Sequence, residues 1–235
     1  MKRVLLSVSL FLLFGIAARP GAYAQNALGG LNFLVGVPMG DFKSNVDKNG
    51  YGISASIGFA PVSSIFMVGV EAGFMRYGTE RRREPFSTTI PDVMVDVETS
   101  NNFALFHGVF RLQPNQGSIR PYLEGLAGIN YLYTQTEIQN RGRGGEEVAS
   151  SNNKDDIAFS YGGGGGLMIQ LYSSEVEGSG LNEVLLDIRG RYIKGGEAEY
   201  LKQGSIRREN GQVKYDVLKS NTDIMTIQVG VALRF

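Results

Sequence analysis

The sequence predicts an all-β fold, an antiparallel up-and-down barrel of eight strands. Three observations predict it: apolar residues alternate with small or polar ones, no long segment has a helical period, and long connections alternate with short ones. The final segment shows the alternation best, because every second residue from Met225 to Phe235 is apolar. Such a strand has one apolar face and one polar or nearly bare face.

Eight alternating segments follow one another, and most are long enough to cross a bilayer, for which a tilted strand needs roughly 9–11 residues. They span residues 28–38, 51–60, 65–77, 102–112, 120–136, 157–172, 184–194 and 222–235. Long connections at 39–50, 78–101, 137–156 and 195–221 alternate with short ones at 61–64, 113–119 and 173–183. Barrels of the bacterial outer membrane have short periplasmic turns and long extracellular loops. We therefore expect a transmembrane barrel with both termini periplasmic.

The first 24 residues are predicted to be a secretory signal peptide. Lys2 and Arg3 precede an apolar run, and Ala22-Tyr23-Ala24 forms a cleavage site before Gln25. A membrane-spanning helix would need roughly 20 apolar residues, and Arg19-Pro20 interrupts the run too early. Residues 25–235 are then one barrel domain. They contain 20 basic and 23 acidic residues and no cysteine, which favours neither a nucleic-acid partner nor a disulfide framework.

The two faces of each segment differ in chemistry. In segment 184–194, apolar residues at 186, 188 and 192 alternate with charged residues at 187, 189 and 191. If lipid surrounds the barrel, the apolar side chains face outward and the charged side chains face the lumen. By this parity the expected lumen residues are Glu71, Arg111, Glu124, Asp187, Arg189, Arg191, Gln228 and Arg234.

An eight-stranded barrel is just wide enough for side chains to fill its interior. Uncompensated charges in so narrow a space are costly, so we expect an ion-pair network rather than an open water column. Arg111 and Glu124 flank the turn at 113–119 on neighbouring segments and form the best candidate pair. Outward aromatic residues are expected to gather in two girdles at the membrane interfaces.

Several stretches carry a resemblance to a known family. They are Pro38-Met39-Gly40-Asp41-Phe42, Gly50-Tyr51-Gly52, the strand alternation, and the final Leu233-Arg234-Phe235. Through them the chain resembles the small eight-stranded outer-membrane barrels of the OmpA and OmpX type, and the broad outer-membrane β-barrel domain family. The resemblance implies that Phe235 is an assembly signal for the barrel-assembly machinery. It also implies a monomer in contact with outer-membrane lipids and lipopolysaccharide.

Support for catalysis or metal binding is weak. His107 is the one histidine and has no Ser or Asp partner at a recognisable spacing, so we expect it to be packed in the lumen, with a catalytic triad as the alternative. The glycines at 162–166 lack the Lys-Ser/Thr of a phosphate-binding loop. The acidic residues 146, 147, 155 and 156 lack EF-hand spacing. The basic run 81–83 is expected to solvate a loop rather than bind lipopolysaccharide phosphates. We expect neither metal nor cofactor.

These observations predict an integral outer-membrane barrel that is not an enzyme. It would have a structural or surface-binding role, in which four long extracellular loops meet an unknown ligand. One alternative is a narrow channel for ions or small hydrophobic solutes, and conductance would distinguish it. The other alternative is a membrane enzyme centred on His107, whose activity would be lost on substitution of that residue.

Overall fold

The computed structural model describes residues 26–235 except 88–89, 115, 141–146, 175–180 and 210–211. The expected signal peptide, residues 1–24, lies outside the described residues. Within them the chain forms ten strands and one short helix. The barrel strands are β1 (Ala27–Pro38), β2 (Gly50–Phe59), β3 (Phe66–Ser87), β4 (Ile90–Leu112), β5 (Ile119–Asn140), β6 (Glu147–Ser173), β7 (Glu183–Gly195) and β10 (Ile224–Arg234). The remaining elements are α2 (Gly40–Asn45), β8 (Glu197–Glu209) and β9 (Gln212–Asn221).

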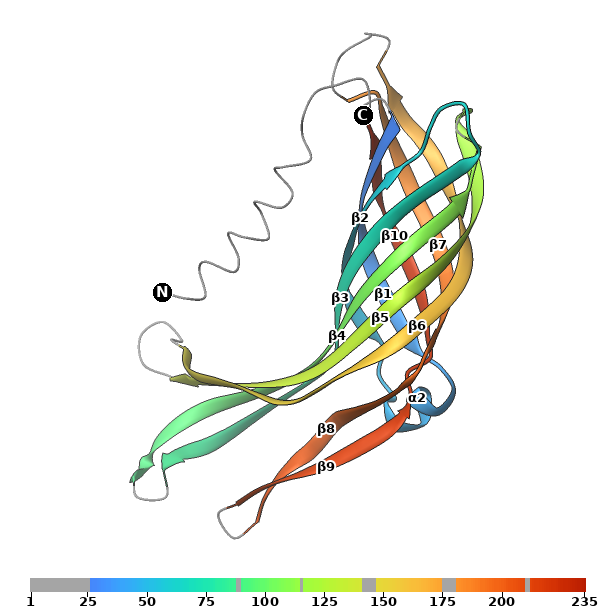
Figure 1. Cartoon of the computed structure of the whole chain (residues 1–235). Coiled ribbons are helices and arrows are strands. Elements are labelled where there is room, and N and C mark those ends of the chain that lie inside the picture. Colours follow the sequence, from blue (N-terminus) through green and yellow to red (C-terminus); the bar gives the residue numbers. More distant parts are fainter. Residues whose placement is uncertain (1–25, 88–89, 115, 141–146, 175–180, 210–211) are drawn as a thin grey trace.

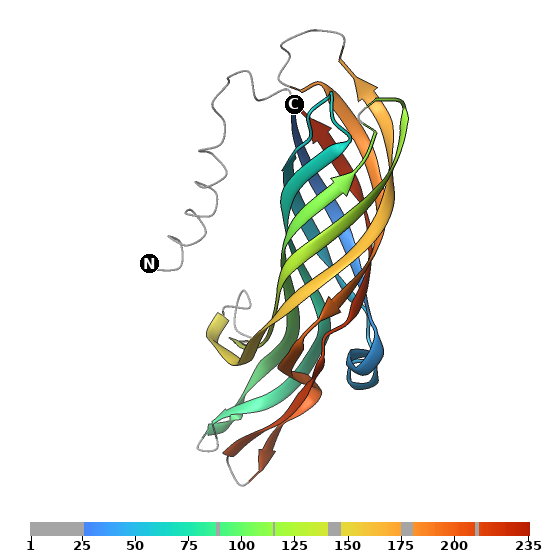
Figure 2. The same cartoon turned by 45° about the vertical axis from the view of Figure 1, so that its right-hand side comes forward.

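Eight strands close into one barrel in the order β1-β10-β7-β6-β5-β4-β3-β2 (Figure 1). All neighbours are antiparallel, and β1 and β10 close the barrel with Leu31 opposite Val231. The eight-stranded antiparallel barrel predicted from the sequence is thereby confirmed. The backbone N–H of Phe235 donates to the carbonyl of Ala27 at 3.0 Å, so the two ends of the barrel sequence meet at one end. We call it the turn end, because the short connections lie there as well (Figure 2).

The outer surface of the barrel is a continuous apolar belt. Leu123 and Phe159, for example, are 66% and 62% exposed. Other exposed apolar residues on the belt are Leu31, Ile53, Val68, Val70, Phe106, Ile129, Ile188 and Val229. Stacked aromatic pairs lie near the two ends, with Phe66–Phe110 at the turn end and Tyr131–Tyr133 at the other. Water does not stabilise so large an apolar surface, whereas the hydrocarbon core of a bilayer does.

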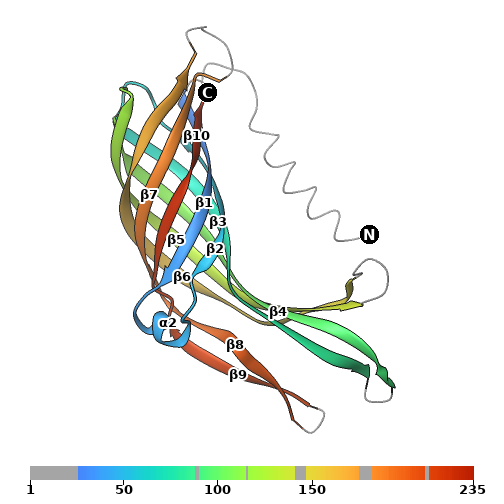
Figure 3. The same cartoon turned by 180° about the vertical axis from the view of Figure 1, so that it is seen from behind.

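The expected loops at 78–101 and 137–156 are wrong, because the residues described there, 78–87, 90–101, 137–140 and 147–156, continue the barrel strands. Pairing of β2 with β3 ends at Tyr51 and Arg76, but β3 remains paired with β4 as far as Ser87. Strands β4, β5 and β6 also stay paired, so four strands leave the barrel as one sheet (Figure 3). Beyond the lipid neither face needs to be apolar, so the alternation that predicts a barrel strand fades although the backbone pairing persists. We call this the extension end.

The other two expected loops also contain regular structure in their described residues. Connection 195–221 forms the β8–β9 hairpin, which lies beside the extension sheet, and connection 39–50 contains helix α2. Arg82 Nη1 donates to the carbonyl of Ile206 at 2.9 Å, and Lys154 Nζ lies 2.6 Å from Glu199 Oε2. The hydrogen bond to Glu199 raises the pKa of Lys154 above its usual value. The extension end is therefore an assembly of hairpins and a helix rather than four independent loops.

Candidate functional site

Two carboxylates on different walls anchor a buried network of charges in the lumen. Glu71 on β3 accepts two hydrogen bonds from Arg191 on β7, with Nη1–Oε1 at 2.7 Å and Nη2–Oε2 at 3.0 Å. Arg189 Nη2 donates to the same Glu71 Oε2 at 2.8 Å. Bidentate pairing between a guanidinium and a carboxylate fixes both groups in one geometry. The network thus ties β3 to β7 across the barrel interior.

Glu124 on β5 is the second carboxylate. It pairs with Arg111 on the neighbouring β4, whose Nη2 lies 2.9 Å from Glu124 Oε2, and its other oxygen accepts from Arg191 Nε. The pair expected from the sequence is therefore in contact, but it is not isolated, because Arg191 bridges Glu124 and Glu71. The guanidinium of Arg111 also lies 4.0 Å from the centre of the Tyr122 ring, a cation–π contact.

The rest of the network completes the charge balance. Asp187 accepts a hydrogen bond from the Tyr122 hydroxyl and lies 3.6 Å from Arg189 Nη1. Gln228 Oε1 accepts from Arg189 Nε at 2.8 Å. Three carboxylates thus face three guanidiniums, and every one of the six is buried. Such groups are stable in a low-dielectric interior only when each charge has a partner.

Arg234 is the one expected lumen residue that lies apart from this network. Its Nε is 3.2 Å from Glu183 Oε2, at the turn end of the barrel. Glu183 also accepts two hydrogen bonds of 2.7 Å from the guanidinium of Arg120. Sequence reasoning missed Arg120 and Glu183 because both stand where a strand was expected to meet a turn. The register of β10 on β7, which only the fold fixes, places Arg234 opposite Glu183.

His107 lies in the lumen with its Nε2 2.8 Å from Ser160 Oγ. The hydroxyl of Ser160 donates its single proton to Asn130 Oδ1 at 2.9 Å. His107, Ser160 and Asn130 therefore form a buried hydrogen-bonded chain that links β4, β6 and β5.

Glycines give the large polar side chains their space. A Cβ on Gly166 would lie 2.5 Å from the Tyr122 hydroxyl, and one on Gly164 would lie 2.9 Å from Arg191 Cγ and 2.2 Å from the carbonyl of Gly190. Both residues face the lumen from β6. This gives the glycine run a specific role, because bulkier residues at these positions would displace the network.

Two apolar clusters close the lumen on either side of the charges, a feature that the sequence analysis missed. At the turn end the buried cluster contains Leu28, Ala60, Met67, Tyr122, Met168, Leu185 and Ala232. At the extension end it includes Leu34, Phe42, Met75, Tyr77, Phe103, Leu132, Ile193, Tyr200 and Ile224. The alternation along the strands does indicate them, since Leu132 and Met168 share the face of the expected lumen residues on β5 and β6.

Phe42 of helix α2 is the centre of the extension-end cluster and is fully buried. Its ring meets those of Tyr200, Tyr77 and Phe103 with centroid separations of 5.1, 5.8 and 6.1 Å. Tyr200 comes from β8, where its hydroxyl accepts from Asn45 Nδ2 at 3.0 Å. The first and last connections of this end therefore meet over the mouth of the barrel, and the described side chains close it.

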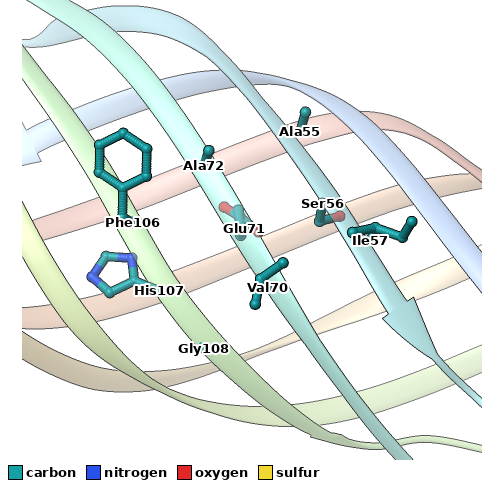
Figure 4. Close-up of a pocket in the computed structure, with 9 residues that line it drawn as sticks. All are labelled: Ala55, Ser56, Ile57, Val70, Glu71, Ala72, Phe106, His107 and Gly108. Carbon is teal, nitrogen blue, oxygen red and sulfur yellow. The ribbon is translucent and has the colours of Figure 1, made fainter. Parts of the chain in front are cut away.

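One further hollow lies on the outer wall, across β2, β3 and β4 (Figure 4). It has a volume of about 430 Å³, and six of its nine lining residues belong to the outward-facing set. Ala55, Ala72 and Gly108 are small, and the larger Ile57, Val70 and Phe106 surround them. The hollow therefore faces lipid and presents apolar groups. Among the described residues, no three His, Cys, Asp or Glu side chains are placed to share a metal ion.

A closed barrel with an apolar outer belt and a charged interior defines a transmembrane β-barrel. No helix in the described part of the chain is both long and apolar enough to span a membrane. No protein-family model matches the sequence, and no curated protein matches it either.

Several solved structures are similar to this chain. Neisserial surface protein A is 12% identical, with 89% of this chain and 96% of that chain covered, at a TM-score of 0.40. Ail, the attachment invasion locus protein of Yersinia pestis, in complex with the heparin analogue sucrose octasulfate, is 15% identical over 89% and 97%, at 0.37. The N-terminal β-barrel domain of Pseudomonas aeruginosa OprF is 11% identical over 90% and 98%, at 0.32.

Proposed function

We propose that this chain is an outer-membrane protein whose barrel anchors a binding surface and conducts no solute. The observation that carries the proposal is the contrast between the two halves of the molecule. The lumen holds a balanced ion network between two apolar clusters. The extension sheet, in contrast, continues about ten residues beyond the last β2–β3 pair, or roughly 30 Å at the rise of a strand.

The same contrast supports one orientation of the barrel in the membrane. The turn end, with the short connections and both termini of the barrel sequence, would lie in the periplasm, and the extension would lie outside the cell, as in other barrels of this membrane. Lipopolysaccharide would surround the extension end of the belt. Phe235 would serve as the residue read by the barrel-assembly machinery, and a monomer suffices because the barrel leaves no strand edge unpaired. Ser160 is fully buried beside His107, in a lumen that the two apolar clusters close, which supports a role that is not enzymatic.

Trimming the extension tests the proposal. Two variants shorten it without touching the barrel, one replacing residues 80–99 and the other replacing residues 203–216 with a short turn, so that Tyr200 stays in place. We expect both to insert and to keep heat-modifiable migration on gels, because the barrel pairing is intact. Cells producing them should lose retention on a panel of immobilised glycans and matrix proteins that retains cells with the full chain.

The matched control alters the other end of the barrel. Replacing Pro61–Ser64 in the first short turn with a Gly/Ser turn changes a periplasmic connection and should leave retention unchanged. Equal retention by the trimmed and full chains would contradict the binding role. Equal loss in the turn variant would show that retention does not depend on the extension.

A further inference from the structure

A small polar hollow lies at the extension end, where β3 leaves the barrel. Its volume is about 60 Å³, and its walls come from the α2–β2 connection, β3, β4 and β8. Pockets that enclose drug-sized molecules measure roughly 300–1,000 Å³, so this hollow admits only a group of a few atoms. It shares no lining residue with the ion network, and its Tyr77 wall belongs to the apolar cluster around Phe42.

The charge of the lining is predominantly positive. Lys48 and Lys202 contribute ammonium groups, and Asp47 contributes the single carboxylate. The two lysines come from distant parts of the sequence, and only the docking of β8 brings Lys202 to the α2–β2 connection. A net positive lining favours an anionic group over a cation.

Tyr77 supplies a second observation, independent of the lysines. Its side chain is buried and lines the hollow, yet its hydroxyl has no hydrogen-bond partner. A buried polar group without a partner costs roughly 1–3 kcal/mol, so such groups are uncommon in native proteins. A ligand in the hollow would remove this cost.

The amide of Asn101 is oriented as a donor. Its Oδ1 accepts a hydrogen bond from Thr134 Oγ1 at 2.8 Å, which turns Nδ2 the other way. That nitrogen lies beside Gly78, where a Cβ would come within 3.1 Å of it, and both residues line the hollow. Asn45 is turned the opposite way, since its Nδ2 already donates to Tyr200, so its side-chain oxygen is the atom left for the hollow.

We propose that this hollow binds a tetrahedral oxyanion, the phosphate or sulfate group of a soluble molecule or of a lipid headgroup. Lys48 and Lys202 supply the charge, and the Tyr77 hydroxyl and Asn101 Nδ2 supply directed hydrogen bonds. Four donors suit the several acceptor oxygens of such a group, and Asp47 limits the excess positive charge. The inference requires the folded barrel and its docked hairpin but does not depend on the proposed surface-binding role.

The test uses the folded full-length mature chain in octyl glucoside micelles, which contain no phosphate. The side-chain amide signals of Asn101 are followed by NMR during titration with potassium phosphate, sulfate or chloride at constant ionic strength. We expect saturable shifts with phosphate and sulfate and none with chloride. Lys202→Gln should weaken the apparent affinity about tenfold, because a charged hydrogen bond is lost. Tyr77→Phe should weaken it about fivefold while leaving the phosphate-free barrel at least as stable.

Lys43→Gln is the matched control, since Lys43 stands in α2 with the same charge but does not line the hollow. It should change the affinity by less than about twofold, because exposed charges act weakly at a distance.

A second arm places the protein in neutral-lipid nanodiscs with intact or dephosphorylated lipopolysaccharide. A shift with free phosphate identifies a soluble source, and a shift only with intact lipopolysaccharide identifies the headgroup. No saturable shift in either arm, or equal losses in Lys202→Gln and Lys43→Gln, would overturn the proposal. Either outcome leaves the extension-trimming result unaffected.

Discussion

Replacing Glu71 with alanine is expected to lower the free energy of unfolding by about 3–5 kcal/mol, because three buried guanidiniums are then left with two carboxylates and one positive charge is uncompensated. Glu71 is the shared partner of Arg189 and Arg191, and neither guanidinium can reach water from its present position. The measurement is reversible urea unfolding in lipid vesicles, followed by tyrosine fluorescence and by heat-modifiable migration.

Glu98→Ala is the matched control for Glu71. Glu98 also pairs with two arginines, Arg76 and Arg81, but those side chains are 44% and 79% exposed on the extension. Exposed pairs contribute about 0–1 kcal/mol, so the control should be nearly neutral. Equal effects of the two substitutions would show that water reaches the lumen charges.

Replacing Phe42 with alanine is expected to cost about 3–5 kcal/mol in the same assay, which is the range for a fully buried phenylalanine. The loss has a specific cause, since the ring contacts Tyr77, Phe103 and Tyr200 at the mouth. The hairpin should also become more accessible to protease, because Tyr200 anchors β8 to the barrel through this contact.

Lys43→Ala controls for the change in helix α2, because Lys43 is exposed next to Phe42. Substitutions at such surface positions usually change stability by less than about 0.5 kcal/mol. If Phe42→Ala and Lys43→Ala were equally mild, the extension-end cluster would not hold the mouth closed.

Period-two alternation predicted the barrel because lipid imposes a strict rule on every membrane-facing position. The same rule does not apply beyond the membrane. The expected segment 102–112 is therefore only the part of β4 that lies in the barrel, whereas the whole strand begins at Ile90. The same alternation assigns Glu71 to the lumen and its neighbours Val70 and Ala72 to the outer face. The sequence could not pair Glu71 with Arg191, since 120 positions separate them and only barrel closure brings β3 and β7 face to face.

The alternation of residues predicted the charged side chains of the lumen but not its two apolar clusters. Met168 and Leu132 lie on the inward face, but an apolar residue on the polar face of a strand has no distinctive local pattern. Phe42 belongs to the stretch Pro38–Phe42 that resembles the outer-membrane barrel family, but nothing in the sequence shows that its ring fills the mouth. Its role depends on Tyr200, which reaches the mouth only through the fold of the β8–β9 hairpin.

The most direct test of the central claim, a closed lumen beneath a binding surface, is conductance of the unmodified protein in a planar bilayer. The balanced charges and the two apolar clusters predict no steady current above that of the bare membrane, at either polarity and in molar potassium chloride. Folding of the inserted protein is verified in the same preparation by heat-modifiable migration. Stable, reproducible conductance steps from the folded protein would contradict the closed lumen and support the channel hypothesis.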